Sequence, residues 1–422
     1  MERPTLLSLR DDVLLAVLSF LEGQDALNFA LACKRLLDLA DSRSVVISSH
    51  TRLKQFYVDE WQATLLRVRY LERLEIKDEA IDCPNSTGSD SGSECEGEHS
   101  SAASDDIFDN DSELKAFVRI RDLFRFTTNL RSLSMPILEQ LDAMFDIDLV
   151  KTVAALRNLE ELSLAHVTDA TLSQLWSMKA SLVSLRLVYR HDPDGVGCKV
   201  TMHALLEVLA KQEGLHTLEL RCFSPTDRPS LALAPTLSTS PYQLGSIRHL
   251  SMSVCSIRVL RDLVPLLPRL STLSFSTRPS IARRRFEVGL PNQDNIGPAV
   301  PAEDTTAWPP LKRLHLAHID EDTPNITQHL GELDRLQVSE AIPLEEWDPT
   351  SDGAPYSPGA YKIGLLLDLL RKTQPIRLHL SFSIDDWDSV AMVILQMLEV
   401  LPSLSMLELC LRPDVRAAGD EA

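Results

Sequence analysis

The pattern L-x-x-L-x-L recurs along most of this chain and constrains its fold more than any other feature. In x-L-x-L-x, the two apolar residues point to one side of an extended strand and the residues between them point to the other. Ten copies carry apolar residues at all three positions, and one more has Pro at the first. The copies begin at Leu71, Leu130, Leu159, Leu182, Leu215, Ile247, Leu270, Leu311, Leu333, Pro375 and Leu404.

The segments between the copies carry apolar residues at helical spacing, for example Val390, Val393, Ile394 and Met397. One strand and one helix cannot bury their apolar sides alone, whereas stacked repeats share a continuous core. A non-repeating α/β protein with Leu-rich strands does not explain so many copies in register. The pattern resembles the leucine-rich-repeat family, which implies an α/β fold, a curved solenoid with one strand and one helix per repeat, over residues 71–412.

Three insertions interrupt the predicted array. Residues 82–113 contain ten acidic residues, eight serines and no Lys or Arg, and so hold about half of the formal charge of −19. This composition cannot bury enough apolar surface to offset the entropy of ordering, so we predict a disordered acidic insertion. Residues 277–310 and 339–361 are rich in Pro and polar residues, and we predict loop insertions there. Residues 413–422 are predicted to form a flexible tail.

Residues 4–45 follow a different pattern. Leu14, Val17, Leu18 and Leu21 recur at helical spacing behind two acidic residues, and a second apolar segment follows Gly23. We predict three short helices here and a connecting segment at 46–70. So small a unit cannot enclose a large core of its own, so its remaining apolar surface is expected to dock on another protein.

The N-terminal segment resembles an F-box. The positions that match are Leu7, Leu9, Asp12, Val13, Leu14, Val17, Leu18, Leu21, Asp25, Leu27, Cys33 and Lys34. Two positions depart from the motif, because Arg10 stands where F-boxes usually have Pro and Leu36 where they usually have Trp. An F-box followed by leucine-rich repeats is the domain order of F-box/leucine-rich-repeat proteins, which this chain therefore resembles.

This resemblance implies the substrate-recognition subunit of an SCF-type cullin–RING ubiquitin ligase. The F-box would bind the Skp-type adaptor and through it the cullin–RING ligase, while the repeats would bind a protein substrate. The chain would perform no catalysis and need no cofactor. The residues assigned to the adaptor contact are Leu9, Leu14, Val17, Leu18, Leu21, Leu27 and Leu31. For each of them the alternative is a place in the core of the three-helix unit.

A second function stays open: a leucine-rich-repeat interaction scaffold that acts outside a ubiquitin ligase. The departure at Arg10 favours this alternative, because it alters the part of the motif that contacts the adaptor.

The candidate substrate site lies in the last repeats, on residues that project between the Leu positions: Arg313, His315, Arg335, Arg377 and His379. Neighbouring strands are ~4.8 Å apart, so these side chains are predicted to form a ladder. Arg is a planar donor, so the ladder is predicted to bind an acidic or phosphorylated protein segment. The alternatives are a solvated strand face and a face covered by the acidic insertion 82–113.

Other functions are disfavoured by the composition. With 61 acidic and 42 basic residues, the chain lacks the basic footprint of a nucleic-acid or membrane-surface protein. No apolar stretch approaches the ~20 residues of a membrane helix. Seven scattered cysteines without a C-x-x-C pair favour the cytoplasm or the nucleus. Catalytic motifs are absent, and His315 and His318 should face opposite sides of a strand, so we predict no metal site.

Overall fold

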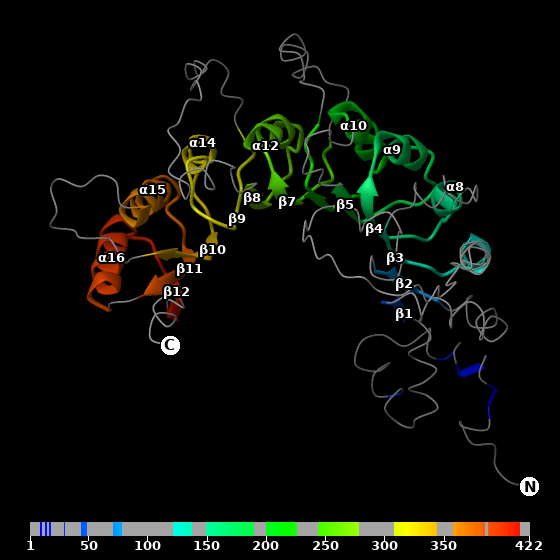
Figure 1. Cartoon of the computed structure of the whole chain (residues 1–422), viewed down its shortest axis with the longest axis horizontal. Helices are drawn as coiled ribbons and strands as arrows, with labels where there is room; N and C mark the ends of the chain where they lie inside the picture. Colours follow the sequence, from blue (N-terminus) through cyan, green and yellow to red (C-terminus); the bar gives the residue numbers. More distant parts are fainter. Residues whose placement is uncertain are drawn as a thin grey trace, which may run out of the picture. The chain divides into compact units, whose positions relative to one another are not determined.

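The computed structural model describes residues 44–48, 71–77, 121–136, 149–189, 200–225, 244–277, 308–343, 358–384 and 387–413, and the single residues 9, 10, 13, 14, 17 and 29. The chain divides into two compact units, residues 1–184 and 185–422. In both units strands alternate with helices, as Figure 1 shows.

The first unit contains four parallel strands that lie side by side in the order of the sequence. They are β1 (Ser44–Ile47), β2 (Arg73–Ile76), β3 (Ser132–Met135) and β4 (Glu161–Val167). The helices α8 (Leu149–Ala154) and α9 (Asp169–Leu175) precede and follow β4. Residues 121–126 are also helical.

The second unit contains strands β5 to β12, again in the order of the sequence. They are β5 (Ser184–Tyr189, which begins at the last residue of the first unit), β6 (Thr217–Arg221), β7 (His249–Cys255), β8 (Thr272–Thr277), β9 (Arg313–Leu316), β10 (Arg335–Pro343), β11 (Arg377–Ile384) and β12 (Met406–Pro413). Consecutive strands from β6 to β12 pair in parallel.

The helices of the second unit lie on one side of its strands (Figure 1). They are α10 (Met202–Lys211), α12 (Ile257–Leu263), the 3-10 turn η5 (Val264–Leu266), α14 (Thr323–Thr327), α15 (Pro358–Thr373) and α16 (Trp387–Val400). Each turns its apolar stripe toward the core; in α10 the buried residues include Leu205, Leu206 and Leu209.

The core follows directly from the repeated motif. All eleven copies coincide with strands β2 to β12, and the second and third motif positions of β2 to β11 are buried. In β9, for example, Leu314 and Leu316 are buried while Arg313 is exposed. The α/β class and its repeating strand–helix alternation are therefore confirmed.

Strand β1 was not predicted, and it corrects a domain boundary. Val45 and Ile47 align with Leu74 and Ile76 of β2, although Ser42 takes the place of the first Leu of the motif. The expected boundary between 4–45 and 46–70 falls inside this strand. Strand pairing thus extends the array to an N-terminal member with only two of the three apolar positions.

Regular structure reaches into the ends of both predicted loop insertions, whose remaining residues lie outside the described part of the chain. Strand β10 continues to Pro343 and α15 begins at Pro358, so both ends of the expected insertion 339–361 are regular structure. Thr277 belongs to β8, and Trp308 is buried and stacks on the His329 ring, with 5.1 Å between ring centroids. Ile342 and Trp308 are buried, and their apolar packing explains why the ends of the predicted insertions are ordered parts of the array.

The acidic insertion 82–113, the tail beyond Pro413 and most of the N-terminal segment lie outside the described residues. Within 4–45, Val13, Leu14, Val17 and Phe29 are helical. The carbonyl of Arg10 accepts backbone hydrogen bonds from Val13 and Leu14, both at 3.1 Å. The departure at Arg10 is therefore compatible with a helical turn at this point.

Candidate protein-binding surface

Three arginines lie directly side by side on adjacent strands of the second unit. In the parallel register, Arg313 of β9 aligns with Arg335 of β10, and Arg335 aligns with Arg377 of β11. All three are exposed, and they stand on the strand side opposite the buried leucines. We call these three residues the arginine row. It confirms the predicted ladder, with neighbouring strands ~4.8 Å apart.

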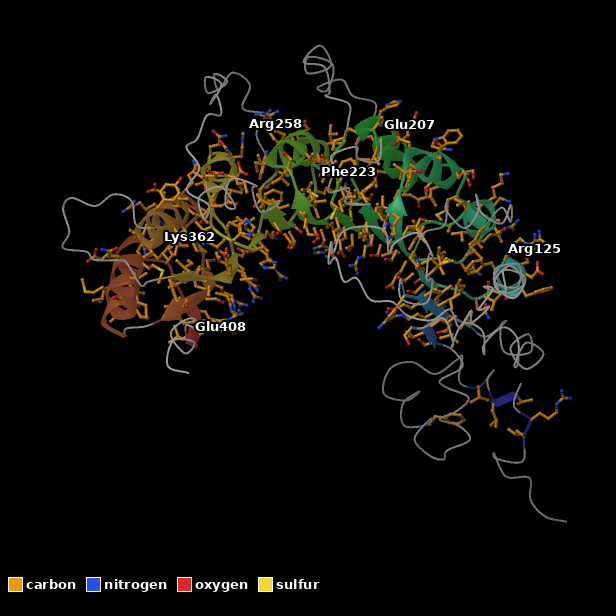
Figure 2. All side chains as sticks on the ribbon, in the orientation of Figure 1. Arg125, Glu207, Phe223, Arg258, Lys362 and Glu408 are labelled. Carbon is orange, nitrogen blue, oxygen red and sulfur yellow. The ribbon has the colours of Figure 1, made fainter. Side chains whose placement is uncertain are left out.

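A second line of polar residues runs parallel to the arginine row, two positions further along each strand. His315, Gln337 and His379 align with one another and are half-buried. We call these three residues the histidine row. Figure 2 shows nitrogen-tipped side chains on the strand side that faces away from helices α14 and α15.

His315 is held by serines from both neighbouring strands. Its Nδ1 lies 3.0 Å from Ser274 Oγ on β8, and its Nε2 lies 2.6 Å from Ser339 Oγ on β10. A neutral imidazole has one donor and one acceptor nitrogen, so one serine donates to the ring and the other accepts from it. His315 therefore links three strands and fixes their spacing beside the arginine row.

Burial lowers the pKa of His315 below its ordinary value of 6.5, and the nearby His379 and Arg335 lower it further. The ring is consequently neutral at pH 7. His315 therefore adds no positive charge to the arginine row at neutral pH, and its protonation adds charge only in acid.

At the strand positions aligned with the two rows, no carboxylate stands over five consecutive described strands. From β7 to β11, the positions aligned with the two rows are His249, Ser251, Thr272, Ser274, Arg313, His315, Arg335, Gln337, Arg377 and His379. None of the ion pairs within the described part of the chain involves an arginine of the row. Three guanidinium groups are thus available to an anionic partner.

Carboxylates stand at the two ends of this stretch, and each lies beside a nitrogen-bearing side chain of a neighbouring strand. Glu219 on β6 forms an ion pair with Arg186 at 3.2 Å. Glu408 on β12 aligns with His379, and its Oε2 lies 3.1 Å from His379 Nδ1, although the geometry is not that of a hydrogen bond. Glu408 borders the site on its C-terminal side. The sequence alone did not indicate this residue as part of the border.

A second polar cluster joins the ends of β8 and β9 to the start of α14. Thr277 Oγ1 donates to Asp320 Oδ2 at 2.7 Å and contacts His318 Nε2, which lies 3.0 Å from the same Oδ2. Asp320 Oδ1 accepts the Asp322 backbone N–H at 3.0 Å. These contacts hold the turn into α14. His318 lies beyond the end of β9, and so not on the same strand as His315, contrary to the expectation from the sequence.

The predicted adaptor residues are described only in part. Leu14 is fully buried, Leu9 and Val17 are half-buried, and the other four, Leu18, Leu21, Leu27 and Leu31, lie outside the described residues. Leu14 is thus covered within the chain itself. Its neighbour Val13 is 42% exposed, so this residue offers apolar surface on the same helical turn.

Comparison with known proteins identifies no family. No protein-family model matches the chain, and no curated protein is significantly similar to it. Across the described ranges, no group of three or more His, Cys, Asp or Glu side chains is arranged to hold a metal ion. Among the described helices, none combines the length and apolar character needed to cross a bilayer.

The arrangement of the arginine row is suited to binding an anionic group. Guanidinium groups at strand spacing offer planar, charge-assisted donors to carboxylates or phosphates. Sequence reasoning found the arginines because each precedes a motif Leu. It missed the serine contacts of His315, because Ser339 lies in a segment predicted as a loop.

Proposed function

We propose that this chain is a non-catalytic substrate receptor of an SCF-type cullin–RING ubiquitin ligase, acting in the cytoplasm or nucleus. Its N-terminal segment binds the Skp-type adaptor, and its repeats bind an acidic or phosphorylated segment of a protein substrate along the arginine row. The observation that carries the binding half is the alignment of Arg313, Arg335 and Arg377 on adjacent strands. The ligase half rests on the F-box resemblance of residues 4–45.

Charge complementarity supports an anionic partner. The arginine row is a local concentration of positive charge in a chain of formal charge −19. Exposed ion pairs are screened by salt over ~8 Å at physiological ionic strength, so binding is expected to weaken as salt is added. A phosphate carries ~1.5–2 negative charges, so phosphorylated ligands should bind more tightly than unphosphorylated ones.

Peptide binding tests the receptor surface. We expect a phosphoserine-rich acidic peptide, followed by fluorescence anisotropy with the full chain, to bind at least about tenfold more weakly to the triple variant Arg313→Ala/Arg335→Ala/Arg377→Ala. Loss of three charge-assisted contacts accounts for a change of this size. Equal binding by the variant and the parent chain would rule out the arginine row as the site.

A matched triple variant separates position from net charge. Lys211, Arg258 and Arg261 are exposed in the same unit, on helices α10 and α12, away from the strands that carry the arginine row. Changing these three to Ala removes the same charge. We expect it to leave peptide affinity within about twofold of the parent chain, since only charges within about a Debye length contribute strongly.

Co-purification tests the ligase half. We expect the full chain to bring down a Skp-type adaptor and a cullin from cell extracts, and Val13→Asp to abolish this while peptide binding persists. Val183 is 42% exposed, the same as Val13, so Val183→Asp is the matched control and should retain the adaptor. The buried Leu14 is a poorer probe, because a charge there would unfold the local helix.

A second candidate function is an interaction scaffold that works outside a ubiquitin ligase. Arg10, which replaces the usual Pro of the motif, favours it. A chain that binds the peptide through the arginine row but brings down neither adaptor nor cullin would establish this alternative and remove the first.

A further inference from the structure

The C-terminal edge of the second unit is incompletely covered. In β11, the exposed fraction of Leu378, Leu380 and Phe382 is at most 1%. The corresponding side chains of β12 are Leu407, Leu409 and Leu411, and all three are only half-buried. Repeat arrays normally end in a unit with a polar outer side, which this edge lacks among the described residues.

Helix α16 exposes apolar side chains beside this edge. Met392, Leu395 and Leu398 are 42%, 56% and 47% exposed, at a spacing of three residues. The buried stripe of the helix, Val393 and Met397, faces the core, and α16 packs against α15. The exposed residues of α16 lie on the helix side opposite this stripe, and the half-buried leucines of β12 form a separate apolar edge.

The backbone of β12 has an open hydrogen-bonding edge. Met406 donates its N–H to Ile376, so even-numbered residues of this strand turn their backbone groups toward β11. The odd residues therefore turn their backbone outward. Leu407, Leu409 and Leu411 each offer an N–H and a C=O, whereas Pro413 at the end of the strand offers only its C=O. Within the described chain no strand pairs with them, and Figure 1 shows β12 as the last strand of the unit. Such an edge is a template for another strand.

The charges of β12 are complementary to those of a second copy of the same strand that runs antiparallel to it. In an antiparallel pair of two copies centred on Cys410, Glu408 of one copy lies opposite Arg412 of the other, twice by symmetry. In the same register Leu409 lies opposite Leu411, which extends the leucine core. Of the registers that keep the leucines on the core side, this is the one that pairs Glu408 with Arg412.

We propose that two copies of this chain associate through β12, in an antiparallel pair centred on Cys410. The open edge supplies backbone hydrogen bonds, the half-buried leucines supply apolar burial, and Glu408 and Arg412 fix the register. The twofold axis runs perpendicular to the sheet, so both arginine rows face the same side. This inference is independent of the proposed function, because it uses none of the residues assigned to ligand binding.

Charge reversal tests the register. We expect the full chain at micromolar concentration to have a dimer mass by light scattering. Glu408→Arg and Arg412→Glu should each raise the dissociation constant by about tenfold or more, because like charges then stand opposite each other. Mixing the two variants should restore the dimer, because each pair is again of opposite sign. A monomeric parent chain, or a mixture that stays monomeric, would overturn the proposal.

Two controls exclude indirect effects. Glu213→Arg makes the same change in an exposed turn of the same unit and should leave the dimer intact. A short bifunctional maleimide should link two chains through Cys410, a free and half-buried thiol, and Cys410→Ser should prevent that link. Linkage that persists unchanged in Cys410→Ser would show that the axis does not pass through this residue.

Discussion

At the scale of single residues, a half-buried neutral histidine organises the exposed side of the strands in the second unit. His315 hydrogen bonds to Ser274 and Ser339 on the two flanking strands, while Arg313 and Arg335 stand one step away. A histidine with a lowered pKa makes the native chain bind fewer protons than the unfolded chain. Stability therefore falls as the pH falls through this range.

We predict that His315→Gln flattens the dependence of stability on pH between about 7.5 and 5. The contribution of His315 is fully present above its unfolded pKa of 6.5 and is lost as the pH falls through the lower folded pKa. Urea unfolding of both chains across this range measures it. His203→Gln is the control, because His203 is exposed on α10, and an equal flattening there would contradict the assignment to His315.

The turn into α14 gives a second prediction at this scale. Burial raises the pKa of Asp320, but hydrogen bonds from His318 and Thr277 outweigh it and bring the pKa below its ordinary 3.8. We expect Asp320→Asn to cost ~1–2 kcal/mol at pH 7, and less as the pH falls below 3.8, where the parent chain loses the same contribution. Thermal unfolding should show that the stability losses of Thr277→Val and Asp320→Asn do not add in the double variant, since both remove one shared contact. Additive losses would contradict this assignment of the contact.

At the scale of elements, local signals decide where helices begin. Thr201 precedes α10, and its Oγ1 accepts the Ala204 N–H at 3.2 Å. Thr168 and Ser256 do the same for α9 and α12. A hydroxyl at this position satisfies a backbone donor that the first turn leaves free. These caps explain why the three helices begin at Met202, Asp169 and Ile257.

We predict that Thr201→Ala destabilises α10 by ~1 kcal/mol, because the Ala204 N–H loses its partner. Thr201→Ser keeps the oxygen and should cost much less. Hydrogen exchange at the first amides of α10 gives the measurement. Exchange that accelerates equally in both variants would show that the methyl group, and not the cap, stabilises the start of this helix.

At the scale of the whole molecule, stability in a repeat array is set by contacts between neighbours. Leu336 in β10 is fully buried between β9 and β11, whereas Leu404, just before β12, is half-buried. The same residue type thus contributes differently at the two positions, according to how many neighbouring repeats cover it.

We expect Leu336→Ala to cost ~2–5 kcal/mol, as for a fully buried Leu, and Leu404→Ala less than half of that. Both are best measured by denaturant unfolding in an Arg412→Glu background, where self-association does not contribute. Equal costs would mean that the C-terminal edge is covered as completely as the middle of the array.

The sequence by itself determined the positions of eleven strands, the residues that form the core and the presence of an arginine in each of three late repeats. These follow from the alternation of side chains along a strand, which is local. It did not determine β1, because Ser42 breaks the motif and only pairing with β2 reveals the strand. Nor did it determine that Leu14 is buried, since a helical stripe does not tell core from contact surface. Tertiary structure decided that His315 lies between two serines, that Glu408 borders the site and that β12 keeps an open edge. These depend on register and on neighbours distant in the sequence, which no local pattern encodes.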